Sequence, residues 1–306
     1  MKKLSWASKL LCRVVQSGKI PNHIAFIMDG NRRFATTQNL SRHKGHLFGF
    51  HKLEETLQWC SELGIKNVTV YAFSIENYKR PKKEVQTLMN LAKKKFQSVI
   101  DDPRFIAKLG IKIRIVGERS LIPKELKIIG AKVEQITKQN TKGTLNVCLS
   151  YTSRNEIVQG IRDITSCLQE NKEQSKKKNN NNKDQFLNNN QIDTNLFDQS
   201  LLLSDSGKPD LLVRTSGECR LSDFMLWQVS DAVISFLPAY WPDFKLHHLL
   251  WVILWFQQKE KSKKNNTNQT KLSQENQKIL ETIKKKRAKK IDKYAQMYDQ
   301  EYLTNK

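Results

Sequence analysis

Six short apolar segments, separated by amphipathic ones, constrain the fold of this chain more than any other feature. Each is rich in β-branched or aromatic side chains, and some are apolar almost throughout, as is typical of strands buried on both faces. The six segments are residues 23–28, 67–73, 111–116, 144–150, 210–214 and 233–237. Apolar spacings of three and four predict helices between and after them, over residues 46–63, 84–100, 123–138, 154–169, 222–230 and 246–257. This alternation predicts an α/β fold, a single domain in which helices flank a central, mainly parallel six-stranded sheet.

Positive charge is concentrated in three segments outside the predicted strands. The formal net charge is +23, and residues 1–20, 171–190 and 257–306 contribute +5, +3 and +8 of it. A solvated, charged periphery explains this distribution better than one basic recognition face does. An RNA-binding protein is the alternative that charge alone suggests, but the chain has no basic motif with interspersed aromatic side chains. We therefore predict no nucleic-acid partner.

The same three segments suggest how the chain is organised. Residues 1–20 are predicted to form an amphipathic N-terminal segment, residues 21–256 the α/β domain, and residues 257–306 a Lys-rich helical tail. Residues 171–190, rich in Asn and Lys, are predicted to be a disordered insertion, because strand-like segments resume after them. For the N-terminal segment two interpretations stay open. It could dock on a membrane surface, with Trp6 as an interfacial anchor, or pack onto the domain.

Polar and charged side chains follow three of the predicted strands. Asp29-Gly30-Asn31-Arg32-Arg33 follows the first, residues 74–81 follow the second, and residues 214–222 follow the fifth. Because functional residues of such folds gather where parallel strands end, we expect these stretches to lie together. A carboxylate, a glycine and several guanidiniums suit a metal and a diphosphate.

Each of these stretches, taken singly, also has a purely structural interpretation. Asp29 could cap the helix that follows it, and Ser or Asn in residues 74–81 could do the same. Residues 214–222 could be a surface turn with an ion pair from Glu218. In the functional interpretation Ser222 opens the helix predicted over residues 222–230, whose N-terminal amides would help to bind a diphosphate.

Other classes of protein lack their signatures here. The five cysteines form no Cys-x-x-Cys pair, which argues against a zinc ribbon or disulfide scaffold and favours a reducing compartment. The longest apolar run, Leu249–Phe256, is far shorter than the ~20 residues of a membrane-spanning helix. No GxxxxGK[ST], GxGxxG or HExxH motif is present, and Asp101-Asp102 is not part of a DDxxD pair, so nucleotide-binding, zinc-protease and trans-prenyltransferase signatures are all missing.

Four motifs, in this order, resemble those of the cis-prenyltransferases, the undecaprenyl diphosphate synthase family. They are HIAFIMDGNRRFA at residues 23–35, YAFSIENYKR at 71–80, DLLVRTSGECRLSDFMLW at 210–227 and WPDF at 241–244. Within the family, Arg32, residues 151–154 and the start that carries Trp6 look most like the catalytic subunits of eukaryotic dehydrodolichyl diphosphate synthases. The resemblance covers about residues 5–256, interrupted by the insertion, so residues 21–256 would be the catalytic domain.

The resemblance implies a prenyl transferase, a ditrans,polycis-polyprenyl diphosphate synthase with a hydrophobic tunnel. Such enzymes use Mg²⁺ to condense isopentenyl diphosphate repeatedly onto farnesyl diphosphate, which gives long-chain polyprenyl diphosphate, the precursor of dolichol for protein glycosylation. Candidates to line the tunnel are Leu88, Leu91, Phe96, Ile128 and Ile129. For each of them ordinary core packing is the alternative.

The family's functional residues can be carried over position by position. The catalytic positions are Asp29, which would also hold Mg²⁺, and Asn77, which resembles a residue proposed to take part in proton removal. The allylic diphosphate would be bound by Gly30, Asn31, Arg32, Arg33, Arg42, His46, Ser74, Glu76 and Arg80. Isopentenyl diphosphate would be bound by Arg214, Arg220 and Ser222.

Two departures from the family pattern imply a partner. Val233 stands where bacterial homodimeric members have an acidic residue that contributes to metal binding, and Val cannot bind Mg²⁺. The Arg-x-Gly signature of single-subunit members is also absent. We therefore expect the catalytic half of a heteromer with a Nogo-B-receptor-type subunit, attached peripherally to the cytoplasmic face of the endoplasmic reticulum membrane. The alternative is a non-catalytic scaffold subunit of the same complex, but such a subunit would be expected to lose Asp29 and the arginines.

Overall fold

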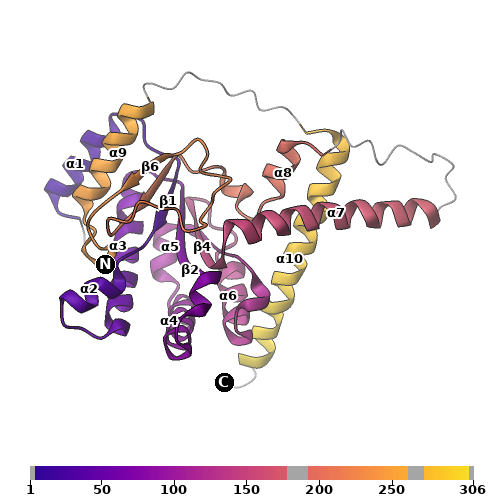
Figure 1. Cartoon of the computed structure of the whole chain (residues 1–306), viewed down its shortest axis with the longest axis horizontal. Helices are drawn as coiled ribbons and strands as arrows, with labels where there is room; N and C mark the ends of the chain where they lie inside the picture. Colours follow the sequence, from indigo (N-terminus) through magenta and orange to yellow (C-terminus); the bar gives the residue numbers. More distant parts are fainter. Residues whose placement is uncertain (1–3, 178–191, 261–271, 303–306) are drawn as a thin grey trace.

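A six-stranded sheet forms the centre of the molecule in the computed structural model, which describes residues 4–177, 192–260 and 272–302 (Figure 1). The strands are β1 (His23–Ile27), β2 (Asn67–Ser74), β3 (Ile111–Val116), β4 (Gly143–Tyr151), β5 (Leu211–Arg214) and β6 (Val233–Phe236). Their order is β3-β4-β2-β1-β5-β6, and every pairing is parallel. The predicted α/β fold with a six-stranded parallel sheet is confirmed, and each strand begins and ends within one residue of its predicted position.

Helices connect and cover these strands. The α-helices are α1 (Trp6–Gln16), α2 (Asn31–Thr37), α3 (Arg42–Glu62), α4 (Lys82–Asp101), α5 (Arg104–Leu109), α6 (Lys124–Thr137), α7 (Ser153–Lys177), α8 (Thr194–Ser200), α9 (Leu246–Glu260) and α10 (Gln274–Tyr302). Short 3₁₀ turns are η1 (Ile75–Lys79), η2 (Arg119–Leu121), η4 (Ser204–Ser206) and η5 (Trp241–Asp243). Residues 171–177, the start of the predicted insertion, continue α7, and residues 178–191 lie outside the described residues.

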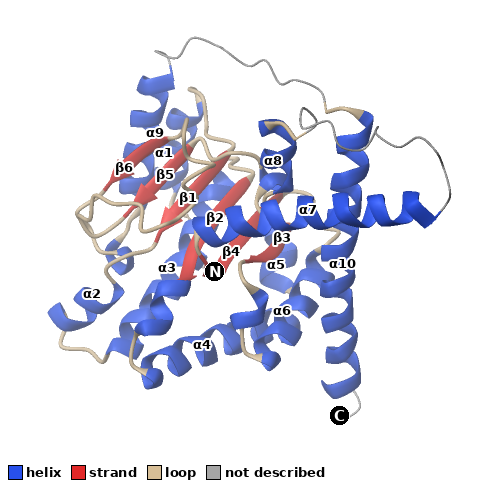
Figure 2. Ribbon diagram, turned by 45° about the vertical axis from the view of Figure 1, so that its right-hand side comes forward, coloured by secondary structure: helices blue, strands red, loops and turns tan. Residues whose placement is uncertain are grey.

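The two faces of the sheet are covered differently. Because successive strand residues point to opposite faces, Ile24 and Phe26 of β1 enter one core while Ala25 and Ile27 enter another. The first core is the larger and joins the sheet to α3, α4, α6 and α9. The second is filled by residues 221–232 together with Leu202 and Leu203, and α7 extends from the end of β4 past α10 (Figure 2).

The helix predicted over residues 222–230 is wrong. Residues 221–232 form turns, and Ser222, Asp223 and Met225 have φ values of 50°, 58° and 49°, in the left-handed region. The apolar residues that suggested a helix, among them Phe224 and Val229, are buried against the second face of the sheet. Their spacing reflects burial of a compact loop rather than helical periodicity. Ser222 therefore does not open a helix.

Within the basic tail, helix α10 packs against the domain. This helix contacts α6, α7 and α8 (Figure 1), and it buries Ile279, Leu280, Ile283, Ala295 and Tyr298. Ion pairs join Lys284 to Asp205, Lys286 to Glu170 and Arg287 to Asp163. Part of the excess charge at the periphery is thus balanced by acidic side chains of the domain.

Candidate active site

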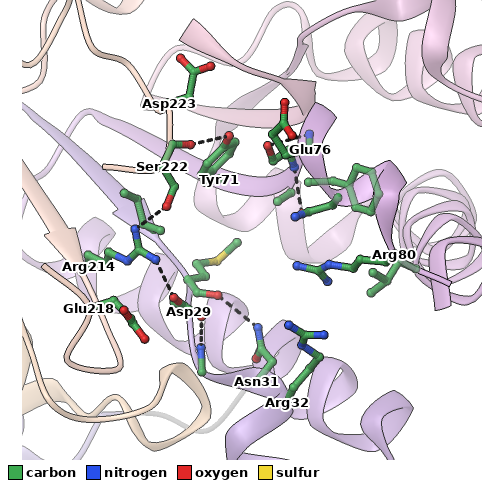
Figure 3. A pocket seen from close by; sticks show the side chains of 18 of the residues that line it. Asp29, Asn31, Arg32, Tyr71, Glu76, Arg80, Arg214, Glu218, Ser222 and Asp223 are labelled. Carbon is green, nitrogen blue, oxygen red and sulfur yellow. Dashed lines mark hydrogen bonds and ion pairs between the residues drawn. The ribbon is translucent and has the colours of Figure 1, made fainter. Parts of the chain in front are cut away.

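The carboxyl ends of β1, β2 and β5 surround a pocket of about 800 Å³ (Figure 3). Thirteen of the fourteen site residues predicted from the sequence line it. They are Asp29, Gly30, Asn31, Arg32, Arg33, His46, Ser74, Glu76, Asn77, Arg80, Arg214, Arg220 and Ser222. Arg42 does not line the pocket. Its guanidinium lies 3.4 Å from the carboxylate of Glu84. The expected meeting of three strand ends at one edge of the sheet is what the structure shows.

Asp29 lies at the centre of the pocket. Its backbone is tied to Thr215, whose hydroxyl accepts from Asp29 N at 3.0 Å, and its carbonyl accepts from Trp241 N at 2.9 Å. One carboxylate oxygen accepts from Arg214 at 2.8 Å, and the other accepts from Gly30 N at 2.7 Å. Burial alone would raise the pKa of Asp29, but these hydrogen bonds and the charges of Arg214 and Arg33 lower it below its ordinary value. Asp29 is therefore a carboxylate at neutral pH.

The alternative in which Asp29 caps the next helix does not hold. The N-cap of α2 is Gly30, with φ +98° and no side-chain capping bond. A Cβ at Gly30 would lie 2.8 Å from the Tyr240 ring and 2.9 Å from Cβ of Ser216. Both the left-handed backbone and the lack of space require glycine here. The turn after β1 thus holds the Asp29 carboxylate in the pocket.

Arg214 is the most deeply buried cation of the pocket, with 3% of its side chain exposed. One of its terminal nitrogens donates to Asp29, and the other donates to Oγ of Ser222 at 2.7 Å and to the carbonyl of Arg220. The planar guanidinium is therefore held in one orientation between the loop after β1 and the loop after β5.

Two acidic residues form ion pairs with the other arginines in and beside the pocket. Glu218 pairs with Arg33 at 3.1 Å and also with Arg220. Glu84, in the first turn of α4, lies 3.2 Å from Arg80, 3.4 Å from Arg42 and 3.8 Å from Arg32. Sequence reasoning missed Glu84. Its one local signal was the spacing of four residues from Arg80, although Arg80 lies in extended backbone just before α4.

Ser74 and Asn77, in the stretch that follows β2, act both as capping residues and as part of the pocket. Asn77 Oδ1 accepts from Ser74 N at 3.1 Å, and Ser74 Oγ accepts from Glu76 N at 3.1 Å, so the two side chains form a capping box for η1. Both also line the pocket. Capping and site geometry are therefore not alternatives here, because the cap fixes where this edge of the pocket lies.

His46 faces the pocket from α3 as a neutral side chain. Burial, together with the charges of Arg80 and Arg32, lowers its pKa to about 4. Its Nε2 is buried and has no hydrogen-bond partner among the described residues. A neutral imidazole with a free nitrogen can donate one hydrogen bond to an anion without adding charge.

The side chains of the pocket could hold a metal ion only if a bound substrate supplied further ligands to it. Among the described residues no group of three or more His, Cys, Asp or Glu side chains is placed to hold a metal. Val233 of β6 is packed in the larger core and does not line the pocket. Asp29 is the central carboxylate, and Mg²⁺ is commonly bound by one or two carboxylates plus substrate phosphates and water. The residues present fit Mg²⁺ in that manner.

Nine residues that line the pocket were not among the predicted site residues, and four of them are polar or charged. Tyr71 on β2, Arg154 at the start of α7, Glu218 and Asp223 all line it. Arg154 donates to the Asp223 carboxylate at 2.9 Å, and Asp223 is largely buried. Arginines outnumber acidic side chains in the lining, so the pocket is basic and can bind two anionic groups side by side.

Comparisons with known proteins identify the family of the chain. Residues 27–264 match the family described as "Putative undecaprenyl diphosphate synthase". The chain is 42% identical over 255 residues to the human dehydrodolichyl diphosphate synthase complex subunit DHDDS, covering 83% of this chain and 72% of that protein. It is 37% identical over 253 residues to a tritrans,polycis-undecaprenyl-diphosphate synthase (geranylgeranyl-diphosphate specific) of Pyrococcus abyssi, covering 83% and 90%. Lavandulyl diphosphate synthase from Lavandula x intermedia, solved with dimethylallyl diphosphate, superimposes with a TM-score of 0.68 at 26% identity, covering 81% and 98%.

Proposed function

The chain belongs to the undecaprenyl diphosphate synthase family, and from this membership we propose the reaction that its pocket performs. It is a cis-prenyltransferase that condenses isopentenyl diphosphate repeatedly onto farnesyl diphosphate and makes a long-chain polyprenyl diphosphate for dolichol. The observation that supports this most directly is Asp29, held between Arg214 on one side and the arginines after β1 and β2 on the other. Relatives at up to 42% identity carry the name dehydrodolichyl diphosphate synthase.

The two groups of cations suit the two substrates. Arg32, Arg33 and Arg80, with His46, would bind the diphosphate of the allylic substrate, and Arg214 and Arg220 would bind that of isopentenyl diphosphate. In each condensation the allylic carbon–oxygen bond breaks, a carbon–carbon bond forms to the isopentenyl group, and a proton is lost. Holding both diphosphates places the reacting carbons close together, and the fixed positive charges stabilise the departing diphosphate. We propose that Asn77, which lines the same pocket, takes part in the removal of this proton.

Asp29 is the residue we propose to hold Mg²⁺. When bound, the ion would neutralise charge on the departing diphosphate. The other requirement of the reaction is a dry cavity for the growing hydrocarbon. Leu88 lines the pocket on the side of α4, whereas Phe96, Ile128 and Ile129 are buried in the larger core behind it. We propose that the product grows along this side of the sheet, between α3 and α4.

The proposal is tested by incorporation of labelled isopentenyl diphosphate into butanol-extractable lipid with farnesyl diphosphate and Mg²⁺. The chain is assayed alone and with a Nogo-B-receptor-type subunit. Activity only with the partner supports both the enzyme and a heteromer, which we propose because Val233 supplies no carboxylate and several relatives are named as complex subunits. Activity of the chain alone supports the enzyme and contradicts the need for a partner. If the folded protein is inactive both alone and with the partner, the result favours the non-catalytic scaffold subunit.

We also propose peripheral attachment to the cytoplasmic face of the endoplasmic reticulum membrane. Among the described residues there is no helix with the length and hydropathy that crossing a bilayer requires. α1 packs on α9 through buried Cys12 and Val15, yet it exposes 79% of Trp6 and 61% of Val14. Leu10, Leu11, Trp251 and Leu254 are further exposed apolar residues of these two helices. The buried face of α1 therefore fits packing onto the domain, and its exposed face fits docking on a membrane surface.

The double substitution Trp6→Ser and Val14→Ser is expected to weaken binding to anionic phospholipid vesicles at least tenfold. Each lost apolar contact with the membrane interface is worth roughly 1 kcal/mol or more. Vesicle flotation measures the bound fraction. Ile161→Ser, which removes an exposed apolar side chain on α7, serves as the control and should bind like the unchanged protein. Equal binding by all three proteins would contradict docking through α1.

A further inference from the structure

The loop that replaces the expected helix is conformationally unusual. We call residues 221–227 the Ser222 loop. Three of its residues, Ser222, Asp223 and Met225, have left-handed backbones although none is glycine. Non-glycine residues rarely adopt this conformation, and they keep it only where the surrounding structure holds them. The contacts that hold this loop therefore matter for where Ser222 lies.

Tyr71 makes the contacts from the side of the sheet. Its hydroxyl lies 3.1 Å from the carbonyl oxygen of Ser222 and 3.2 Å from that of Tyr151, and it donates its proton to this pair of acceptors. Its ring stacks on Phe224, with centroids 4.4 Å apart and planes inclined by 16°. Burial raises the pKa of Tyr71, so the hydroxyl keeps the proton that it donates.

The start of α7 makes the contacts from the other side. Ser153 N donates to the carbonyl of Asp223 at 2.7 Å, and Ser153 Oγ accepts from Leu226 N at 3.0 Å. Arg154 donates from its backbone and its side chain to the Asp223 carboxylate, at 3.1 and 2.9 Å. These contacts fix Asp223 and Leu226, whereas the carbonyl of Ser222 itself is fixed by Tyr71.

Ser222 in turn orients the buried guanidinium of the pocket. Its hydroxyl accepts from Arg214 at 2.7 Å, and the same guanidinium donates to Asp29 (Figure 3). A rotation of the Ser222 backbone would move this acceptor and leave that nitrogen of Arg214 with the carbonyl of Arg220 alone. Tyr71 belongs to β2, on the allylic side of the pocket, so it links the two halves of the site.

We propose that Tyr71 is a positioning residue that holds the Ser222 loop in its left-handed conformation, so that Ser222 and Arg214 present a fixed geometry to the diphosphate of isopentenyl diphosphate. This inference rests on the proposed function for the identity of that ligand. The phenol acts through Ser222 and takes no part in the chemistry.

Tyr71→Phe tests this, because it removes the hydroxyl and keeps the stacked ring. The KM for isopentenyl diphosphate is expected to rise about five- to tenfold, whereas the KM for farnesyl diphosphate should change less than twofold. Tyr78→Phe is the matched control. Tyr78 also bonds through its hydroxyl, to Leu121 O at 2.8 Å and Ser150 Oγ at 2.7 Å, but it does not touch the Ser222 loop. Equal changes in both KM values, or none, would overturn the proposal.

A double-substitution cycle separates an indirect role from a direct one. If Tyr71 acts through Ser222, the combination of Tyr71→Phe with Ser222→Ala should raise the KM for isopentenyl diphosphate no further than Ser222→Ala does. Effects that multiply would instead mean that the tyrosine contacts the substrate itself, and would overturn the positioning role.

A third readout needs no turnover, so it distinguishes failure of this inference from failure of the proposed function. Arg220 directly precedes the Ser222 loop, and trypsin cleaves after arginine. Without substrate, cleavage between Arg220 and Leu221 should be at least fivefold faster in Tyr71→Phe than in the unchanged protein and in Tyr78→Phe. Unchanged cleavage would overturn the inference even if the chain proves to be the enzyme proposed. Faster cleavage would support it even if the substrate differs.

Discussion

Replacing Asp29 with alanine is expected to lower the turnover of isopentenyl diphosphate by at least a factor of 10³. A factor of this size corresponds to about 4 kcal/mol of transition-state stabilisation, comparable to the loss of a central charged group from other active sites. The structural reason is that Asp29 is the central carboxylate of a pocket whose other charged side chains are six arginines and three carboxylates. Without it, nothing at this position would retain Mg²⁺ beside the departing diphosphate.

The same substitution leaves Arg214 buried without its counter-charge. A loss of about 2–3 kcal/mol in the free energy of unfolding is expected, less than the full cost of breaking a wholly buried pair, because Asp29 is 32% exposed. Asp29→Asn keeps a hydrogen-bond acceptor for Arg214 and should lose less stability but as much activity. Urea unfolding and initial rates measure the two effects separately.

Asp292→Asn provides the control for the Asp29 substitutions. Asp292 is an exposed carboxylate on α10 and does not line the pocket. Its turnover and unfolding free energy should match those of the unchanged protein. Turnover of Asp29→Asn within tenfold of the control would contradict the central role given to this residue.

Arg214→Lys is expected to reduce kcat/KM for isopentenyl diphosphate at least 100-fold, at saturating farnesyl diphosphate. The buried guanidinium donates to Asp29 with one nitrogen and to Ser222 with the other. A lysine ammonium retains the charge but cannot reproduce this planar fork. Two charge-assisted hydrogen bonds can then no longer be made together, and each is worth about 1.5–3 kcal/mol.

The matched control for Arg214→Lys is Arg162→Lys, an exposed arginine of α7 outside the pocket. Initial rates at varied isopentenyl diphosphate concentration compare the two variants. If Arg214→Lys retained more than a third of the unchanged kcat/KM, the requirement for a fixed fork would be refuted. A loss confined to farnesyl diphosphate would instead place Arg214 in the allylic half of the pocket.

The sheet could be predicted from the sequence because its strands are nearly continuous apolar runs. Strands buried on both faces need apolar side chains at almost every position, and this local pattern is legible without knowledge of partners. The loop over residues 221–232 was mispredicted for the corresponding reason. Phe224, Met225 and Val229 are buried by tertiary packing, and their spacing imitates that of a helix. Apolar spacing records which residues are buried but not which backbone conformation buries them.

The candidate site could be predicted where its residues directly follow strands, because the carboxyl ends of parallel strands meet at one edge of the sheet. That rule placed Asp29, Arg80 and Arg214 at one edge of the sheet, and all three line one pocket. Arg42 was predicted from the family resemblance and not from this rule; it begins α3 and pairs with Glu84 outside the pocket lining. The rule could not find Tyr71, because the tyrosine touches residues that lie 80 and 151 positions further along the chain.

The fold class, the family and the residue types gathered at the carboxyl edge of the sheet could all be predicted from the order of residues along the chain. These follow from local apolar patterns and from motifs whose order is visible along the chain. Which charges face each other depends on the three-dimensional arrangement: Asp29 pairs with Arg214, and Glu84 with arginines of three different segments. The left-handed conformation of the Ser222 loop and its contact with Tyr71 depend on that arrangement as well. The physical reason is that hydrogen bonds and ion pairs act over a few ångströms in space, whatever the separation of their partners along the chain.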